Sequence, residues 1–562
     1  MTENNSQRRS SVALETGLLA LVMGGLVWVA APDVNEAHYL VKARHFWDRS
    51  YCPTDIFTNS HETHWAFYIT HGWLFPLLGY ELGTWVGRLA SWLVIAWGIV
   101  VLSRVFFNGM GIAILVGGLT VMLNESLNLA GEWFVGGVEG KCYAYGFGFA
   151  AIAFWFRGRF PLTWILLGLA CAFHIVVGIW LTSAMVFAWW VDRWLPAPPD
   201  AEECVPASSR PFLRWFPAAC LSLLFFAVGF WPAIMQNADA SREVIIQAAK
   251  AQSLWRLAHH QLATEFHRWF LFLPLVVIWL FLARSNWQSR NHHLARFNLV
   301  VLGSLLIALG GLVLSLLASF SNGPASDLSA LLLTLYWFRL ADVLIPLGCV
   351  INAGIFFSAL PKEMGAGRFA VVLATVGCLG GMAWNLYQGQ WDVRSGSARQ
   401  TVMLPQDPAQ QQREMEAEKN WIRTCLWIRA NTPPDATFIT PLNQQTFKWY
   451  AHRAEVASRK DMPQNATSIL PWLKRLKVLF SIGPELENSM ELSMQDQVAW
   501  EYRPLLFEGE LPFSADYVVL EQRWVDEFLR YQPLPENLKQ VYPERGARKS
   551  TFAVFQQSDF VD

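Results

Sequence analysis

Two carboxylates follow the first apolar segment of the chain, in the string PDVNEAHYL. Asp33 and Glu36 are three positions apart, so on a helical turn both would lie on one face. At a boundary between water and an apolar phase, partial desolvation raises a carboxyl pKa into the range that suits a general base. We therefore predict Asp33 and Glu36 as candidate catalytic residues. The alternative is that Asp33 only caps the helix that follows it.

Charged residues also occur at the edges of later apolar segments. The string GGVEGKCYAYGF contains Glu139 and Lys141 just before an apolar run, where charges are costly and tend to be functional. In LYWFRLADVLIP, Tyr336, Arg339 and Asp342 recur at helical spacing, on one face of a predicted helix. We predict that these five residues bind substrate, with the Arg339 guanidinium directed at an anionic lipid head group. The alternatives are a Glu139–Lys141 pair that stabilises a turn, and a buried Arg339–Asp342 clamp.

Histidines accompany other hydrogen-bond donors in two predicted loops. Arg256, His259 and His260 occur in LWRLAHHQ, where they can present donors to phosphate oxygens. His64 occurs in HETH, whose spacing is not that of the HExxH zinc motif. We predict these four residues as substrate contacts, with an ordinary surface histidine as the alternative for His64. No residue pattern indicates a divalent metal, so any metal requirement stays unknown.

Composition tells us which elements must position these residues. The chain has 562 residues, of which 53% are hydrophobic and only 15% charged. Soluble domains are about 25% charged, so this chain has the composition of a membrane protein. The formal net charge of −1 gives no indication of a nucleic-acid partner. The eight cysteines show no CxxC or Cys/His metal spacing, so they read as small core residues.

Apolar runs long enough to cross a membrane divide most of the chain. They lie at 13–31, 84–107, 110–128, 142–157, 162–191, 212–236, 267–284, 297–320, 329–360 and 368–388. The first run ends Val-Ala-Ala, which allows a signal peptide, but its length favours an uncleaved first helix. The short connections between runs are basic and should be cytoplasmic. This pattern requires the run 162–191 to cross twice as a hairpin, with His174 near its tip, which makes about eleven helices.

The predicted topology places the polar chemistry on one side. With the N-terminus inside, a large first outer loop at 32–83 and the segments 129–141 and 237–266 face outward. We expect a transmembrane domain at 1–388 and an extracytoplasmic soluble domain at 389–562.

The predicted soluble domain has the pattern of a small α/β fold. Trp421, Cys425 and Ile428 recur at helical spacing before Asn-Thr-Pro-Pro ends the helix. Short β-like runs follow at Thr437–Thr440, Asp516–Leu520 and Phe552–Phe555. The domain contains no Gly-rich phosphate loop and no nucleophile-elbow motif, so it carries no sign of an independent enzyme.

The whole plan resembles the GT-C superfamily of polytopic glycosyltransferases that use polyprenyl-phosphate sugars. It also resembles an uncharacterised bacterial family of GT-C-like membrane proteins, through NEAHYLVKARHFWD, GGVEGKCYAYGF, YWFRLADVLIP and NTPPDATFITPLNQQTFKWYAHRAEV. Members of the superfamily carry an acidic residue just after the first helix, which matches Asp33 and Glu36 here. Asn35-Glu36 stands where many members have adjacent Asp-Glu. That departure makes Glu36 the preferred base and puts metal binding by a carboxylate pair in doubt.

The resemblance implies a membrane glycosyltransferase of the bacterial inner membrane. Its partners would be a lipid-linked sugar donor, membrane lipids and an extracytoplasmic acceptor, with no nucleic acid. Two alternatives remain. A transporter or flippase would favour ionisable residues at the bilayer midplane and inverted repeats. A non-catalytic scaffold would use the outer domain to bind a partner.

Overall fold

The computed structural model describes most of the chain. The described residues are 2–194, 211–286, 291–361, 365–391, 408–442, 444–480, 514–530, 533, 538–544 and 550–557. Three basic residues of the predicted inner connections, Arg210, Arg290 and Lys362, lie outside them.

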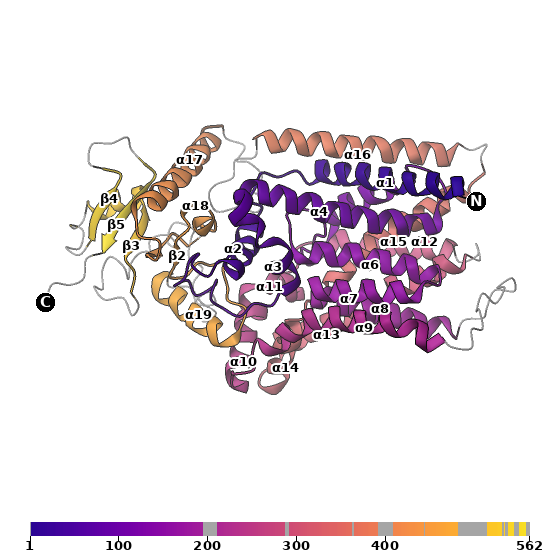
Figure 1. Ribbon diagram of the computed structural model, residues 1–562, viewed down its shortest axis with the longest axis horizontal. Helices are drawn as coiled ribbons and strands as arrows, with labels where there is room; N and C mark the ends of the chain where they lie inside the picture. Colours follow the sequence, from indigo (N-terminus) through magenta and orange to yellow (C-terminus); the bar gives the residue numbers. More distant parts are fainter. Residues whose placement is uncertain are drawn as a thin grey trace.

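Long helices that run side by side form the larger part of the molecule (Figure 1). They are α1 (Thr2–Leu26), α4 (Leu74–Phe106), α5 (Ile112–Leu127), α6 (Gly140–Phe156), α7 (Phe160–Phe173), α8 (Ile175–Asp192), α9 (Pro211–Met235), α12 (Trp269–Asn286), α13 (His292–Phe320), α15 (Arg339–Ala359) and α16 (Ala366–Trp391). Within the described chain, seven helices are long and apolar enough to cross a membrane. Each predicted apolar run contributes one helix to this bundle, except that 162–191 contributes two. These apolar helices make the chain a multi-pass membrane protein. Within lipid, a helix can satisfy all of its backbone polar groups through its own hydrogen bonds.

The predicted hairpin at 162–191 is confirmed. His174 has extended backbone angles, φ −153° and ψ 98°, and separates α7 from α8. The two helices then pack closely, since a Cβ atom on Gly178 would lie 2.5 Å from the backbone nitrogen of Cys171. The reversal brings α8 back along α7.

Two predicted boundaries were wrong. The helix α4 begins at Leu74 rather than at 84, because an apolar helical turn precedes the kink at Gly79, where φ is 74°. The first loop therefore spans 27–73. The run 329–360 is not one helix either. It divides into α14 (Pro324–Leu333) and α15 at Tyr336, whose φ of 51° ends a helix, so Tyr336 does not share a helix face with Arg339.

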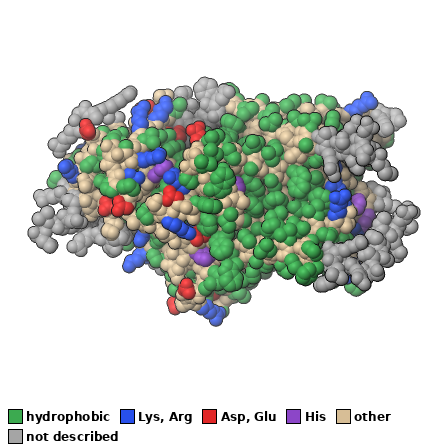
Figure 2. Space-filling model, in the orientation of Figure 1, with side chains coloured by type: hydrophobic (Ala, Val, Ile, Leu, Met, Phe, Trp, Pro, Cys, Tyr) green, Lys and Arg blue, Asp and Glu red, His purple; other side chains and the backbone are tan. Residues whose placement is uncertain are grey.

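One end of the bundle carries the segments that were predicted to face outward. We call it the domain-side end. It holds α2 (Glu36–Trp47), α3 (Trp65–His71), α10 (Arg242–Lys250), η1 (Ala251–Arg256), α11 (Ala258–Gln261), η2 (Ala263–Glu265) and α14 (Figure 1). Figure 2 shows hydrophobic side chains spread over the bundle, acidic and basic ones mixed toward the domain-side end, and basic ones at the opposite end. This arrangement suits a membrane around the bundle.

The part of the chain after α16 forms a small α/β unit, which we call the C-terminal region (408–557). Its helices are α17 (Pro408–Asn431), α18 (Phe447–Ala451), α19 (Ala466–Phe480) and α22 (Gln522–Phe528). Its strands are β1 (Thr437–Ile439), β2 (Ala454–Glu455), β3 (Tyr517–Glu521), β4 (Leu538–Tyr542) and β5 (Phe552–Gln557). They form a mixed sheet in the order β2-β1-β3-β5-β4, with β1 parallel to β2 and β3. The three predicted strands and the predicted helix are confirmed, and the sequence did not reveal the short β2 or the edge strand β4.

The C-terminal region sits on the first loop through a buried ion cluster. The Nζ atom of Lys448 lies 2.5 Å from a Glu455 carboxylate oxygen, 2.8 Å from one of Asp461 and 3.1 Å from one of Asp55 in the first loop. All four side chains are buried. Burial alone would lower the pKa of Lys448, but the three carboxylates outweigh it and raise the pKa well above its usual value. The ammonium group therefore stays charged in the junction.

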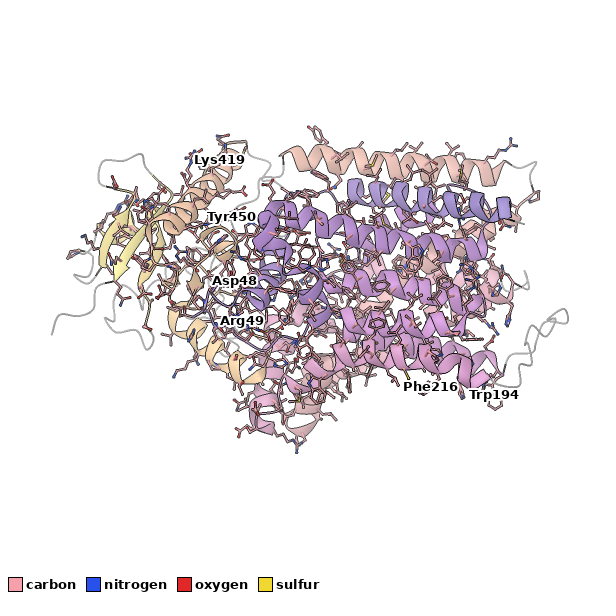
Figure 3. All side chains as sticks on the ribbon, viewed as in Figure 1. Asp48, Arg49, Trp194, Phe216, Lys419 and Tyr450 are labelled. Atoms are coloured by element: carbon pink, nitrogen blue, oxygen red, sulfur yellow. The ribbon has the colours of Figure 1, made fainter. Side chains whose placement is uncertain are left out.

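Further contacts extend this junction. His38 of α2 approaches the other oxygen of Asp461 at 2.8 Å. Apolar side chains of α10, η1 and α19 join one buried core cluster, which includes Ala248, Ala251 and Trp472. Figure 3 places Asp48 and Arg49 of the first loop at the same end of the molecule as the labelled Tyr450 of α18. The two regions are thus joined by charge and by apolar packing.

Replacing Lys448 by methionine should weaken the junction. Three buried carboxylates would lose their common counter-ion, and breaking a buried ion pair in this way costs about 3–5 kcal/mol. We expect a lower melting temperature in detergent, measured by tryptophan fluorescence, and faster release of the C-terminal region by limited proteolysis. The control is Lys474→Met, on the exposed face of α19. Equal stability of the two variants would contradict a structural role for the cluster.

Candidate active site

The loop 128–139 joins α5 to α6 at the domain-side end, and Asp342 of α15 holds its first part. One oxygen of Asp342 accepts a hydrogen bond from the Leu129 nitrogen at 2.8 Å. The other oxygen accepts from Ala130 at 2.9 Å and Glu132 at 3.2 Å. Asp342 is completely buried. Because backbone nitrogens occupy both of its oxygens, we assign Asp342 a structural role in place of the predicted substrate contact. The alternative prediction, an ion pair between Arg339 and Asp342, is not formed.

Glu36 holds the other part of the same loop. Its oxygen Oε1 accepts from Arg88 Nε at 2.7 Å and from the Val138 nitrogen at 2.8 Å. Its oxygen Oε2 accepts from Arg88 Nη2 at 2.6 Å and from the Asp33 nitrogen at 2.7 Å. The Glu36 and Arg88 side chains are 0% and 1% exposed. This is a buried bidentate ion pair that ties α2 and α4 to the loop.

This geometry changes which of the two predicted carboxylates is the better candidate for the general base. A general base needs a lone pair that can reach the substrate proton, and each Glu36 oxygen already accepts two hydrogen bonds. Asp33 is only partly buried, and each of its oxygens accepts one, from Val34 at 2.6 Å and from Gly137 at 3.1 Å. We therefore transfer the proposed role of base from Glu36 to Asp33.

Gly137 permits the loop to close over both acids. A Cβ atom there would lie 2.9 Å from the Asp33 Cβ and 3.0 Å from the Glu36 carboxyl carbon. The glycine-rich string that stands out in the sequence thus has a steric reason, because any side chain at this position would push the loop away from the carboxylates.

Asn35 connects the C-terminal region with the charges of the loop. Its side-chain oxygen accepts from Lys460 Nζ at 2.6 Å, and its amide nitrogen donates to Glu139 at 2.6 Å. Burial raises the pKa of Glu139, although the Lys141 ammonium lowers it in part. Asn35 therefore forms a neutral link between a cation of one region and an acid of the other.

The chain of charges continues across the loop to Arg339. Lys141 Nζ lies 3.6 Å from Glu139 and 3.3 Å from Glu132. Glu132 in turn lies 3.4 Å from Arg339 Nε. Acids and bases alternate along this path, and Lys141, Glu132 and Glu139 are all buried. The alternative Glu139–Lys141 pair is present, but only as part of this longer chain.

Aromatic and histidine rings surround Arg339. Its guanidinium lies 3.7 Å from the centre of the Tyr336 ring, and its Nη1 atom lies 3.1 Å from His174 Nε2. The His64 ring lies 5.6 Å from that of His174 and 5.5 Å from that of Tyr39. Burial and the charge of Arg339 lower the pKa of His64 to about 4, so His64 is neutral at physiological pH. The surface-histidine alternative for His64 is not supported, because the ring packs inside this cluster.

The predicted Arg256–His260 group lies on the next segment. His260 Nδ1 lies 2.5 Å from the carbonyl oxygen of Ala130 in the loop. His259 is exposed, and the centre of its ring lies 4.0 Å from that of His260, with the two ring planes tilted by 43°. Arg256 donates from Nε to the carbonyl oxygen of Arg459 at 2.8 Å. This group thus contacts the loop on one side and the C-terminal region on the other.

The structure therefore gathers the predicted residues at one end of the bundle. Sequence reasoning did not single out Arg88, His38 or Lys460 as parts of the arrangement, whereas Glu132 stands out in the sequence beside Glu139 and Lys141. Arg88 had a signal, since it is a charged residue within an apolar run. Lys460 lies in the stretch 437–461, whose many Gln, Lys, Arg and aromatic residues favour contacts with an acceptor or with the loops of the bundle but do not single out one lysine. Within the described chain, no three His, Cys, Asp or Glu side chains are arranged to hold a metal ion.

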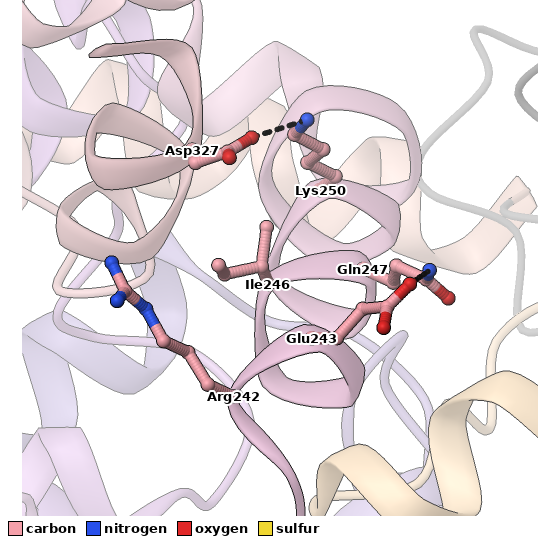
Figure 4. A pocket seen from close by; sticks show the side chains of 6 residues that line it. All are labelled: Arg242, Glu243, Ile246, Gln247, Lys250 and Asp327. Carbon is pink, nitrogen blue, oxygen red and sulfur yellow. Dashed lines mark hydrogen bonds and ion pairs between the residues drawn. The ribbon is translucent and has the colours of Figure 1, made fainter. Parts of the chain in front are cut away.

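A separate open pocket lies between α10 and α14, away from these residues (Figure 4). It is lined by Arg242, Glu243, Ile246, Gln247, Lys250 and Asp327. Lys250 and Asp327 form an ion pair of 2.5 Å across it. None of the predicted site residues contributes to this lining.

Comparison with known proteins gives one family match and several similar structures. A family model described as a domain of unknown function (DUF6798) matches residues 419–479, from α17 to α19. None of the curated proteins compared matches the sequence.

Among solved structures, the chain is similar to ArnT from Cupriavidus metallidurans. The ArnT structure bound to undecaprenyl phosphate is 14% identical to this chain, with a TM-score of 0.47. The apo structure is 12% identical, with a TM-score of 0.44. Each of the two matches covers 98% of both chains. The Archaeoglobus fulgidus oligosaccharyltransferase tethered with an acceptor peptide is 13% identical with a TM-score of 0.38. That match covers 97% of this chain and 74% of the other. These proteins belong to the GT-C superfamily, which the sequence resembles. At identities and TM-scores this low, the function has to be argued from the chain's own residues.

Replacing Glu36 by glutamine should lower stability, because Arg88 would keep a buried charge without its counter-ion. Losing one partner of a buried pair costs about 3–5 kcal/mol, and we expect a lower melting temperature by tryptophan fluorescence. The double variant Glu36→Gln/Arg88→Met should recover part of the loss. The control is Glu81→Gln, at an exposed position of α4. A melting temperature unchanged by Glu36→Gln would return Glu36 to the list of candidate bases.

Proposed function

We propose that this protein is a membrane glycosyltransferase that moves a sugar from a polyprenyl-phosphate donor to an acceptor at the domain-side end. The observation that carries the proposal is the arrangement around the loop 128–139. A partly exposed carboxylate, Asp33, lies beside a buried chain of alternating acids and bases at the edge of an apolar bundle. Ionisable residues at such an edge are costly to bury, and they commonly mark a path or a site for a substrate.

In the proposed reaction, Asp33 accepts the proton of an acceptor hydroxyl. The hydroxyl oxygen attacks the anomeric carbon of the donor sugar and forms the new glycosidic bond. The bond between that carbon and the phosphate oxygen breaks, and its electron pair leaves with the lipid phosphate. Arg339, Arg256 and the two histidines beside Arg256 supply positive charge and hydrogen-bond donors for the growing charge on the phosphate.

The residues around Arg339 suit this role. The guanidinium is held on the Tyr336 ring and against His174, so its orientation is set before a ligand arrives. A fixed donor costs no reorganisation during the reaction, which is the basis of electrostatic catalysis. His64 stays neutral beside Arg339. Its ring can therefore donate a hydrogen bond to a sugar hydroxyl or accept one from it.

We infer that the domain-side end is extracytoplasmic in a bacterial inner membrane. Arg104 and Arg157 lie at the opposite end, near the connections after α4 and α6, and basic connections favour the cytoplasm. The C-terminal region would then select the acceptor outside the cell membrane, above a transmembrane domain of residues 1–388. The transporter alternative is less well supported, because the charges of the site gather at the end of the bundle rather than at its middle.

Replacing Asp33 by asparagine should nearly abolish transfer. General-base help is worth about 10²–10⁴ in rate, and asparagine cannot accept the proton. The assay follows lipid phosphate released by purified protein from labelled polyprenyl-phosphate sugars, with a membrane extract as the source of acceptor.

The matched control is Asp239→Asn, an exposed aspartate of the same end of the molecule, which should transfer at the rate of the unmodified protein. Both variants should melt at the same temperature as the unmodified protein. Normal turnover by a folded Asp33→Asn variant would rule out Asp33 as the base.

A further inference from the structure

Cationic side chains from two regions meet where η1 and α11 face the segment before α19. Arg256 is held there by its hydrogen bond to the carbonyl oxygen of Arg459. The neighbouring residue Lys460 reaches the Asn35 side chain, two positions after Asp33. His259 is exposed on the same segment as Arg256. The bundle and the C-terminal region therefore each contribute positive charge to one place beside the candidate base.

These cations differ from the others of the site in lacking counter-ions. Among the residues that the structure describes, neither Arg256 nor Lys460 forms an ion pair, whereas Arg88, Lys141 and Lys448 each form one or more. Both residues are only partly buried, and the neighbouring His259 is exposed. An unneutralised group of cations at an accessible position is the usual form of an anion site.

The electrostatics of the group agree with this geometry. Burial and the charge of Arg459 lower the pKa of Arg256 to about 10. Burial and the charge of Arg256 lower the pKa of Lys460 to about 8, although Glu139, Asp461 and Asp33 act in the opposite direction. The cations therefore destabilise one another, and a bound anion would relieve that repulsion.

We propose that Arg256 and Lys460, together with His259, bind one phosphate group across the interface between the bundle and the C-terminal region. A guanidinium offers a planar fork of donors to phosphate oxygens, and an ammonium adds a compact point charge. The identification of this phosphate with that of the lipid-linked donor rests on the proposed function, but the binding of phosphate does not. The C-terminal region would thus complete the donor site in addition to selecting the acceptor.

Phosphate binding to the full-length protein in detergent micelles tests this site. Titration calorimetry is carried out with a sugar-free polyprenyl phosphate in one arm and with inorganic phosphate in the other. Each of Lys460→Gln and Arg256→Gln removes a charged hydrogen bond and should weaken binding about 10- to 100-fold. Lys474→Gln makes the same change at an exposed position of the same region and should bind like the unmodified protein. Lys460→Arg keeps the charge and should retain most of the affinity.

The outcomes separate the sources of the phosphate. Tight binding of the lipid with weak binding of inorganic phosphate supports the site with a lipid head group as its ligand. Equal effects of the variants in both arms support it with a free phosphate. Unchanged affinity in folded Lys460→Gln and Arg256→Gln variants, in both arms, overturns the proposal. If affinity is unchanged in these variants while Asp33→Asn still abolishes transfer, the proposed function stands without this phosphate site. If phosphate binding behaves as expected and no sugar transfer is found, the phosphate site stands without the proposed function.

Discussion

The position of the C-terminal region depends on one buried ammonium group. Lys448 is surrounded by Asp55 from the first loop and by Glu455 and Asp461 from its own region. Removing such charges from water costs several kcal/mol per ion, and this cost is offset only when all partners are in place. The cluster can therefore form only when the two regions are assembled. Because Asp461 follows Lys460 directly, the same assembly places Lys460 beside Asn35 and the candidate base.

The loop 128–139 depends on buried charge in the same way. Asp342 holds its beginning through backbone nitrogens, and Glu36, paired with Arg88, holds its end. With both acids engaged in structure, Asp33 remains as the partly exposed carboxylate of the pair predicted from the sequence. The residues that maintain the site and the residue proposed to act in it are thus close neighbours with different roles.

Much of the architecture could be predicted from the sequence because its signals are local. Apolar runs and basic connections were enough to place the bundle helices in order and to require the reversal at His174. The candidate residues Glu139, Lys141, Arg339 and His260 also gather at one end, since a lipid bilayer tolerates ionisable groups mainly near its surfaces. The short strand β2 and the break at Tyr336 were missed, because two residues carry too little pattern and a positive φ at tyrosine has no sequence signature.

The sequence by itself determined that this is a multi-pass membrane protein with a C-terminal α/β region, and which residues could carry chemistry. Only the tertiary structure decided which of them are free to do so. Glu36 and Arg88 are 52 positions apart, and Lys460 and Asn35 are 425 positions apart. Hydropathy and periodicity describe neighbours along the chain, whereas ion pairing depends on distance in space. Glu36 was therefore the preferred base in the sequence, and its bidentate pair with Arg88 in the fold moved that role to Asp33.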